Sequence, residues 1–274
     1  MTATSLTESM TQLPHVLFRR SRRFYLLYDA RWLFALSAAI GVMQLSHFEP
    51  IAQTWKAYFP LVFPVVLYAH ILCNVFIHNA CHANFPKAIN RLFGEILGLI
   101  VLTRFASWEI IHARHHKYSD DLDLDPHPLD KSYWHFIARS FAGIERQLQR
   151  TYFETHGDTK ENRRRETIRT YISYATTAMV LAFWWRLTGN VGFFFFYLPA
   201  TVLGWLHVMH FNWVTHNALA KDGDFKPVNI DKGIYWIGNR LLFGIYMHAN
   251  HHRKVGVFNP LKMEAKEQDW GTIS

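Results

Sequence analysis

The sequence predicts an all-α integral membrane protein with four transmembrane helices in two hairpins and a cytoplasmic helical cap that holds a histidine-rich dimetal site. Half of the 274 residues are hydrophobic and 16% are aromatic, yet the mean hydropathy is near zero because the apolar residues are gathered into blocks. Four of these blocks approach the roughly 20 residues that a helix needs to cross a bilayer. Most of the 17 histidines lie outside these blocks, in long polar segments.

The four predicted spans cover about residues 32–48, 58–77, 171–185 and 191–209. The first and third are short of apolar residues, so we expect flanking aromatic side chains to occupy the membrane interfaces there. A fifth apolar stretch, at 92–103, is shorter and contains a glutamate, which favours an interfacial or buried helix over a span.

Charge in the connecting segments predicts the topology. The loops near 49–56 and 186–190 are short and carry one basic residue each, whereas Arg19–Arg23 and Arg146–Arg169 are strongly basic. Basic segments stay on the cytoplasmic side. We therefore expect two hairpins that enter the membrane and return to the cytoplasm.

We expect a single domain over residues 1–274, because no linker, repeat or change of composition divides the chain. No convincing cleavage pattern follows the first apolar block, so this block is expected to remain as an anchor. The predicted cap comprises about residues 78–168 and 211–274, and both termini and the metal site are expected to be cytoplasmic.

The net charge of +8 is consistent with a bilayer as the anionic partner. Aromatic-rich blocks of near-spanning length argue against a nucleic-acid-binding protein. The two cysteines, Cys73 and Cys81, lack the spacing of a zinc ribbon or a redox pair. Sulfur is therefore not expected as a metal ligand.

Histidine spacing is the most informative motif. One box has the form H-x-x-x-H and two have the form H-x-x-H-H; positions i, i+3 and i+4 share one face of a helix. A single H-x-x-H-H box can arise by chance, but three boxes that each lie just past a predicted span or in a predicted cytoplasmic segment are not explained by chance. Eight imidazoles exceed the four ligands of a tetrahedral zinc site, so we expect two metals. The eight are His78, His82, His112, His115, His116, His248, His251 and His252.

These boxes resemble those of the membrane fatty acyl desaturase and hydroxylase superfamily, and the resemblance covers about residues 60–255. The segment Lys117–His127 resembles the acidic stretch that follows box two in acyl desaturases. The motif from Asn212 to His216 resembles the Asn-x-x-x-His of acyl-CoA desaturases, which implies that His216 is a ninth ligand and that Asn212 either supports the ligands from behind or is linked to the metals through water. Box one departs from acyl-CoA desaturases, since three residues separate its histidines, as in many acyl-lipid members. The acyl carrier therefore stays open between CoA, acyl carrier protein and lipid.

The resemblance implies two iron ions as the cofactor and O₂ as co-substrate. An unactivated methylene offers no polarised atom for acid or base chemistry, which favours redox iron over zinc. The expected reaction removes two hydrogens from neighbouring carbons of an acyl chain and releases water. No haem domain is evident in the chain, so a separate ferredoxin-like or cytochrome-type protein with its reductase is expected to supply electrons.

Other reactions are open on the same centre. It can add a hydroxyl group, form a triple bond or remove a carboxylate. The resemblance in the acidic segment and the Asn-x-x-x-His motif favours double-bond or triple-bond formation over the other oxidations. A histidine-rich metal-binding protein or transporter is the non-enzyme alternative. A transporter places its ligands at mid-membrane on broken helices, whereas these boxes are predicted at one face.

Four residues of the acidic segment are expected near the site: Asp120, Asp123, Asp125 and His127. The carboxylates are either metal ligands or hydrogen-bond partners that orient the imidazoles, and we favour the second role. The resemblance implies a supporting role for His127. Histidines 70, 207 and 210 lack the box spacing and are left out of the predicted ligand set.

Overall fold

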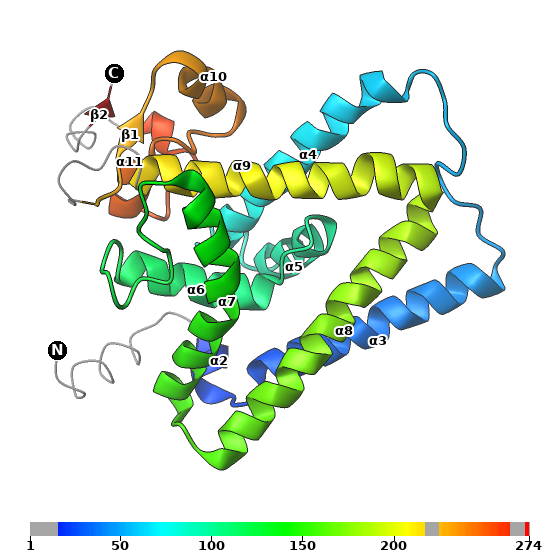
Figure 1. Cartoon of the computed structure of the whole chain (residues 1–274), viewed down its shortest axis with the longest axis horizontal. Coiled ribbons are helices and arrows are strands. Elements are labelled where there is room, and N and C mark those ends of the chain that lie inside the picture. The colour runs from blue at the N-terminus through cyan, green and yellow to red at the C-terminus, as the bar shows by residue number, and fades with distance from the viewer. Residues whose placement is uncertain (1–15, 217–224, 264–271, 274) are drawn as a thin grey trace. The chain divides into compact units, whose positions relative to one another are not determined.

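The computed structural model describes residues 16–216, 225–263 and 272–273, which are mostly helical (Figure 1). Both chain termini, which were predicted to be cytoplasmic, lie outside the described residues. So do residues 217–224 and 264–271 of the predicted cap. The elements, in chain order, are α2 (Val16–Arg20), α3 (Phe24–Leu45), α4 (Phe59–Cys81), α5 (Asn90–Ile100), α6 (Phe105–Lys117), α7 (Tyr133–His156), α8 (Lys160–Val191), the π-helix η1 (Gly192–Tyr197), α9 (Leu198–His216), β1 (Asn229–Ile230), α10 (Gly233–Leu241), α11 (His248–Arg253), the 3-10 helix η2 (Pro260–Lys262) and β2 (Thr272–Ile273).

The chain divides into two compact units. We call the first, Met1–Tyr68 with Glu145–Val202, the α3–α8 unit; the second, Ala69–Ile144 with Leu203–Ser274, is the histidine unit. The prediction of a single domain over 1–274 stays a prediction.

In the α3–α8 unit, α3 packs along α8 (Figure 1). The side chain of Thr159 caps α8 by accepting a hydrogen bond from the Asn162 backbone N–H at 3.2 Å. Buried Arg169 donates to Glu166 at 3.0 Å and to Glu145, and its guanidinium lies 5.8 Å from the ring centroid of Tyr25. The buried Arg169 guanidinium is thus paired with carboxylates of opposite sign, close to Tyr25 in the first turn of α3.

Gly189, two residues before the end of α8, interrupts the helical run that continues through η1 into α9. Its φ of 76° lies in the left-handed region that glycine tolerates best. A Cβ there would lie 2.5 Å from Gln53 Oε1 and 2.9 Å from Pro50 Cβ, so the loop after α3 leaves no room for a side chain. The predicted loop at 186–190 corresponds to this break.

Among the residues that the structure describes, three helical segments are long and apolar enough to cross a membrane, or four if the bent pair α5 and α6 counts as one span. They are Phe24–Leu45, Phe59–Cys81 and Lys160–His216. The last one contains both predicted spans, 171–185 and 191–209, on either side of Gly189. The arrangement in two hairpins stays a prediction.

The helices extend beyond the predicted bounds because polar residues continue them. Helix α3 begins eight residues before position 32 and includes Asp29, which is fully buried and whose backbone carbonyl accepts from the Thr176 hydroxyl at 3.0 Å. Helix α8 begins at Lys160 rather than near 171. Hydropathy alone locates the apolar middle of a span and misses ends of this kind.

In the histidine unit, α4 and α9 approach each other closely at Gly204, where a Cβ would lie 3.2 Å from Asn74 Nδ2. Val75 of α4, Phe211 of α9 and Leu242 after α10 share one apolar core. A second core joins Ile77 of α4 to α5 and α6. These contacts fix the helix ends that carry the histidine boxes.

Helices α5 and α6 meet at an angle of 106°. The predicted interfacial or buried segment at 92–103 forms most of α5 and the bend after it. Helices α5 and α6 are long and apolar enough for a span only when the two are taken together.

The strands β1 and β2 pair in parallel, with Asn229 beside Thr272. The all-α prediction overlooked this pair, because two residues are too few to show the alternation that marks a strand.

Candidate metal centre

The boxes lie at helix ends of the histidine unit. His78 occupies the last turn of α4, and His82 follows its final residue. Box two lies on the C-terminal half of α6, box three forms most of α11, and His216 is the last residue of α9. The helical spacing i, i+3, i+4 turns each set of imidazoles to one side.

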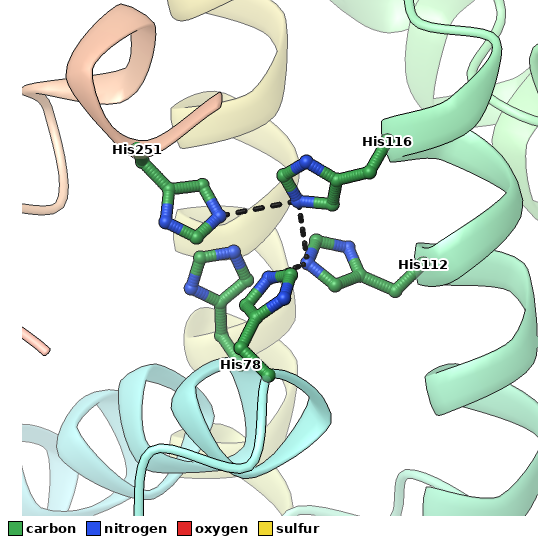
Figure 2. Close-up of side chains that lie close together, drawn as sticks. His78, His112, His116 and His251 are labelled. Carbon is green, nitrogen blue, oxygen red and sulfur yellow. Dashed lines mark hydrogen bonds between the residues drawn. The ribbon is translucent and has the colours of Figure 1, made fainter. Parts of the chain in front are cut away.

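The structure brings together all nine histidines of the predicted ligand set, in two clusters. Within each cluster, one nitrogen per imidazole lies within 4.8 Å of the equivalent atoms of the others. Figure 2 shows that α4, α6 and α11 direct their rings toward one another. The five-histidine cluster is His78, His82, His112, His116 and His251, and the four-histidine cluster is His115, His216, His248 and His252.

The ring nitrogens face one another at short range. In the five-histidine cluster, the His112 Nε2 lies 2.9 Å from His82 Nε2 and 3.1 Å from His116 Nε2, which is itself 3.1 Å from His251 Nε2. In the four-histidine cluster, the His248 Nε2 lies 2.8 Å from that of His216. A neutral imidazole has one N–H, so a hydrogen on one nitrogen cannot satisfy several facing partners.

This donor set fits metal ions. Imidazole nitrogens lie about 2.1 Å from a bound metal, so ligands of one ion stand at most about 4.2 Å apart, close to the observed convergence. The Nε2 atoms of His78 and His115 are buried and have no hydrogen-bond partner among the described residues. Burial also lowers the pKa values of His248, His251 and His252 well below the ordinary imidazole value, which favours the neutral form that binds metal.

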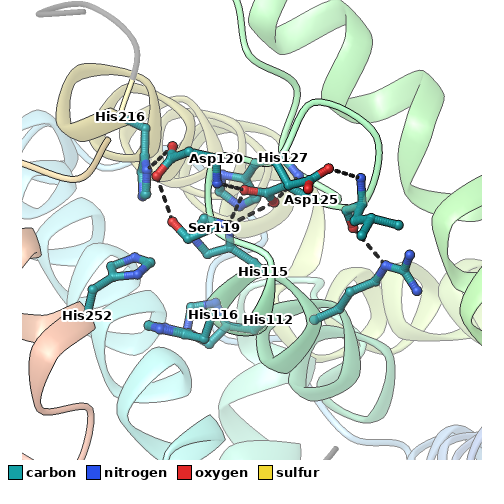
Figure 3. A network of polar contacts seen from close by, with 12 residues as sticks. His112, His115, His116, Ser119, Asp120, Asp125, His127, His216 and His252 are labelled. Carbon is teal, nitrogen blue, oxygen red and sulfur yellow. Dashed lines mark hydrogen bonds and ion pairs between the residues drawn. The ribbon is translucent and has the colours of Figure 1, made fainter. Parts of the chain in front are cut away.

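Two carboxylates of the acidic segment hold rings of the four-histidine cluster (Figure 3). The Nδ1 of His115 lies 2.9 Å from Asp125 Oδ1, and the Nδ1 of His216 lies 2.9 Å from Asp120 Oδ1. A carboxylate only accepts, so both Nδ1 atoms carry the hydrogen and both Nε2 lone pairs are directed into the cluster. Carboxylates commonly orient metal-binding imidazoles in this way.

The two carboxylates differ in their surroundings. Asp125 also accepts from the backbone N–H groups of Asp120 at 2.7 Å and His127 at 2.8 Å. Burial raises the pKa of Asp125 to about 6, although the nearby His127 and these N–H groups oppose the rise. Burial also acts to raise the pKa of Asp120, but hydrogen bonds from His216 and Ser119 outweigh it, and the pKa is lowered.

A hydrogen bond joins α6 to the loop that carries Asp120 and Asp125. The Nε of fully buried Arg114 donates to the Leu124 carbonyl at 2.9 Å. Asp120 has a φ of 64°, a left-handed conformation in which aspartate is enriched among non-glycine residues. This local turn lets the backbone N–H of Asp120 reach Asp125 while its side chain reaches His216.

The other three predicted supporting residues, His127, Asn212 and Asp123, differ in whether they contact the predicted ligands. The ring of His127 stacks on His115, with centroids 4.1 Å apart at 19°. The side-chain amide of Asn212 donates to the Val208 carbonyl of its own helix at 2.9 Å. Asp123 is exposed, and its backbone N–H donates to the Asp121 carboxylate, outside both histidine clusters.

Among the residues that fix box three, sequence reasoning missed Asn229 and left open whether Asn250 supports the neighbouring histidines. Asn229 and Asn250 are fully buried and bond to each other: the Asn229 amide donates to Asn250 Oδ1 at 2.9 Å, and the Asn250 backbone N–H donates to Asn229 Oδ1 at 3.0 Å. The Asn84 amide also donates to the Val255 carbonyl at 3.1 Å, joining the end of box one to the segment after box three. Only the position of Asn250 inside the box marks any of these residues in the sequence.

Trp108 is a further missed contact of the five-histidine cluster. Its ring stacks on His112, with centroids 5.5 Å apart and planes at 13°. It lies one turn before His112 on α6, but a tryptophan at helical spacing is also typical of an ordinary core position.

Comparison with known proteins points to one family. The family model described as "Fatty acid desaturase" matches residues 53–258. A "Fatty acid desaturase" of Bacillus subtilis is 21% identical over 225 residues, which cover 68% of this chain and 62% of the relative. An "sn-1 oleoyl-lipid 12-desaturase" of Picosynechococcus is 29% identical over 100 residues, 35% of this chain and 27% of the relative. The chain thus spans less than two thirds of the length of these relatives. No solved structure matches.

Proposed function

The chain belongs to the fatty acid desaturase family, and from this premise we propose that it is an O₂-dependent membrane desaturase that introduces a double bond into an acyl chain. The observation that carries the proposal is the convergence of nine histidines in two adjoining clusters. Five ligands from one cluster and four from the other would hold two iron ions, with Asp120 and Asp125 orienting two of the rings.

Two bound irons would supply the redox chemistry that unactivated C–H bonds require. The residues of this chain supply the framework. Phe211 packs against His248, with ring centroids 4.7 Å apart, and against His78 at 6.3 Å, so that an aromatic wall borders both clusters. Apolar walls of this kind hold the imidazoles in place and limit the access of water.

The remaining assignments are part of the same proposal. The protein is embedded in the bilayer by four spans in two hairpins, and its histidine clusters face the cytoplasm. Its substrate is a fatty acyl group on CoA, an acyl carrier protein or a lipid. Its electrons come from a separate ferredoxin-like or cytochrome-type carrier and its reductase.

The proposal can be tested by lipid profiling of a host that expresses the chain together with such a carrier. Membrane lipids are derivatised at double bonds and analysed by mass spectrometry. We expect acyl chains lighter by two hydrogens with the wild type and none with the His251→Ala, His252→Ala variant. Exposed His135, outside both clusters, gives a matched control: His135→Ala should retain the wild-type profile.

Each other outcome changes the assignment. Acyl chains heavier by one oxygen would identify a hydroxylase, and shortened terminal alkenes would identify an oxidative decarboxylase. An unchanged lipid profile with a chain that carries its full metal content would contradict desaturation and favour a metal-binding protein.

A further inference from the structure

Helix α10 of the histidine unit presents a row of exposed apolar side chains. Ile234, Ile237 and Leu241 are 76%, 51% and 53% exposed. Positions i, i+3 and i+7 lie on one face of a helix, so these side chains form a continuous stripe. Large apolar side chains gathered on one exposed face mark a contact surface.

The opposite face of α10 is fixed to the protein. The amide of fully buried Asn239 donates to the Ile230 carbonyl at 2.9 Å, and its oxygen accepts from the Tyr246 backbone N–H at 2.9 Å. Beside the stripe, one turn after Ile234, a Cβ on Gly238 would lie 2.8 Å from the Tyr246 ring, so the helix backbone rests on this ring on that side. The stripe therefore cannot turn inward without breaking these contacts.

Helix α10 lies beside the ends of two candidate spans. Tyr235 stacks with His210 of α9, with ring centroids 6.1 Å apart at 9°, and the Tyr246 hydroxyl lies 3.2 Å from His207 Nε2. Tyr246 also shares an apolar core with Val75, near the end of α4. Where α4 and α9 leave a bilayer, α10 lies at the level of the interface.

The flanks of the stripe match this level. Lys232 and Arg240 are exposed. Arg240 pairs with Asp231 at 3.1 Å, and its guanidinium lies 3.7 Å from the ring centroid of Trp236, which is itself 48% exposed. Tryptophan and basic side chains are typical of the headgroup region, where a cation meets lipid phosphate and an apolar face enters the acyl chains.

We propose that α10 is an interfacial helix: Ile234, Ile237 and Leu241 insert among the acyl chains of the leaflet nearest the histidine clusters, and Lys232 meets anionic headgroups. The nine residues of α10 extend about 13 Å, too short to span. This inference rests on the proposed membrane embedding of the chain.

The position of α10 bears on the path that the substrate takes to the histidine clusters. Only residues 242–247 separate α10 from His248, the first histidine of box three. Lipid contact through α10 therefore anchors the segment that leads into the four-histidine cluster at the bilayer surface. This favours an acyl chain that reaches the site from the membrane.

A site-specific photocrosslinker tests the contact directly. Ile237→p-benzoylphenylalanine is prepared in nanodiscs of phosphatidylcholine and phosphatidylglycerol, irradiated, and analysed by mass spectrometry for lipid adducts. Two matched positions give the scale. Phe34→p-benzoylphenylalanine probes a side chain that is 77% exposed on the candidate span α3, and Leu122→p-benzoylphenylalanine probes one that is 82% exposed between the carboxylates of Asp121 and Asp123.

We expect lipid adducts at position 237 at a yield similar to position 34 and at least about tenfold above position 122, because apolar insertion and not exposure alone brings lipid to the probe. A crosslink from position 237 to a second copy of the chain, or a lipid yield no higher than at position 122, would overturn the inference. Failure at position 34 would instead contradict the membrane embedding itself. Metal content measured on each variant shows that it has folded.

Discussion

Buried polar groups are arranged differently in the two units. In the α3–α8 unit, Arg169 is paired with Glu145 and Glu166, so each charge has a partner of opposite sign. In the histidine unit, neutral imidazoles face one another through their Nε2 atoms, as His116 and His251 do at 3.1 Å. In the first arrangement opposite charges meet within the protein, whereas the second calls for a cation. The ion pairs of Arg169 therefore hold helices together, whereas the facing imidazoles are suited to binding a cation.

A difference of the same kind exists inside the histidine unit. Carboxylates hold two rings of the four-histidine cluster, His115 and His216, whereas the short nitrogen–nitrogen distances of the five-histidine cluster join imidazoles to one another. The two proposed metal sites should therefore respond differently to changes in the acidic segment.

The largest effect is expected for loss of a ligand. His251→Ala should abolish desaturation and remove metal from the five-histidine cluster, because four rings would then border a site built from five. Elemental analysis and lipid profiling of the purified variant and its host measure both effects. Full metal content together with full activity in this variant would contradict the shared centre.

Arg169→Leu should destabilise the protein by about 3–5 kcal/mol without loss of metal, because it leaves the buried Glu166 carboxylate without this partner. The midpoint of chemical unfolding in detergent reports the loss. Arg163→Leu removes the exposed ion pair with Asp158 and should leave the midpoint nearly unchanged. Metal loss at unchanged stability in the Arg169 variant would erase the contrast between the units.

Asp125→Asn should weaken metal binding at the four-histidine cluster by about 10–100-fold, because the amide no longer fixes the Nδ1 hydrogen of His115. A competitive chelator titration measures the affinity. The exposed Asp123 lies two residues away, and Asp123→Asn should change it far less. Equal effects of the two variants would show that the loop acts through its charge alone.

The smallest effect is expected for His127→Ala. This variant removes the ring that stacks on His115 but no ligand, so both metals should stay and activity should fall by about tenfold or less, the low end for residues behind the ligands. Initial rates and metal content measured on one preparation decide this. Loss of one metal would make His127 part of the coordination set.

The sequence was sufficient to predict which nine histidines the structure gathers into the two clusters, because box spacing follows the helix period and the Asn-x-x-x-His resemblance adds His216. It did not predict how they divide. His115 and His116 are neighbours in the chain but point about 100° apart on α6, so they enter different clusters.

The supporting contacts depend on backbone conformation that spacing does not encode. Asp120 reaches His216 through a left-handed turn, and exposed Asp123 lies outside both clusters although it belongs to the same acidic run. The span ends were missed for a related reason. Asp29 and Arg169 lower the local hydropathy, yet both are buried by partners that only the fold brings close.

We propose that the two histidine clusters hold two iron ions. The iron-to-chain ratio of protein purified from iron-supplemented cells, combined with Mössbauer spectroscopy, tests this. We expect a ratio near two and two high-spin iron sites with nitrogen-rich coordination. An active preparation with one iron or none per chain would contradict it.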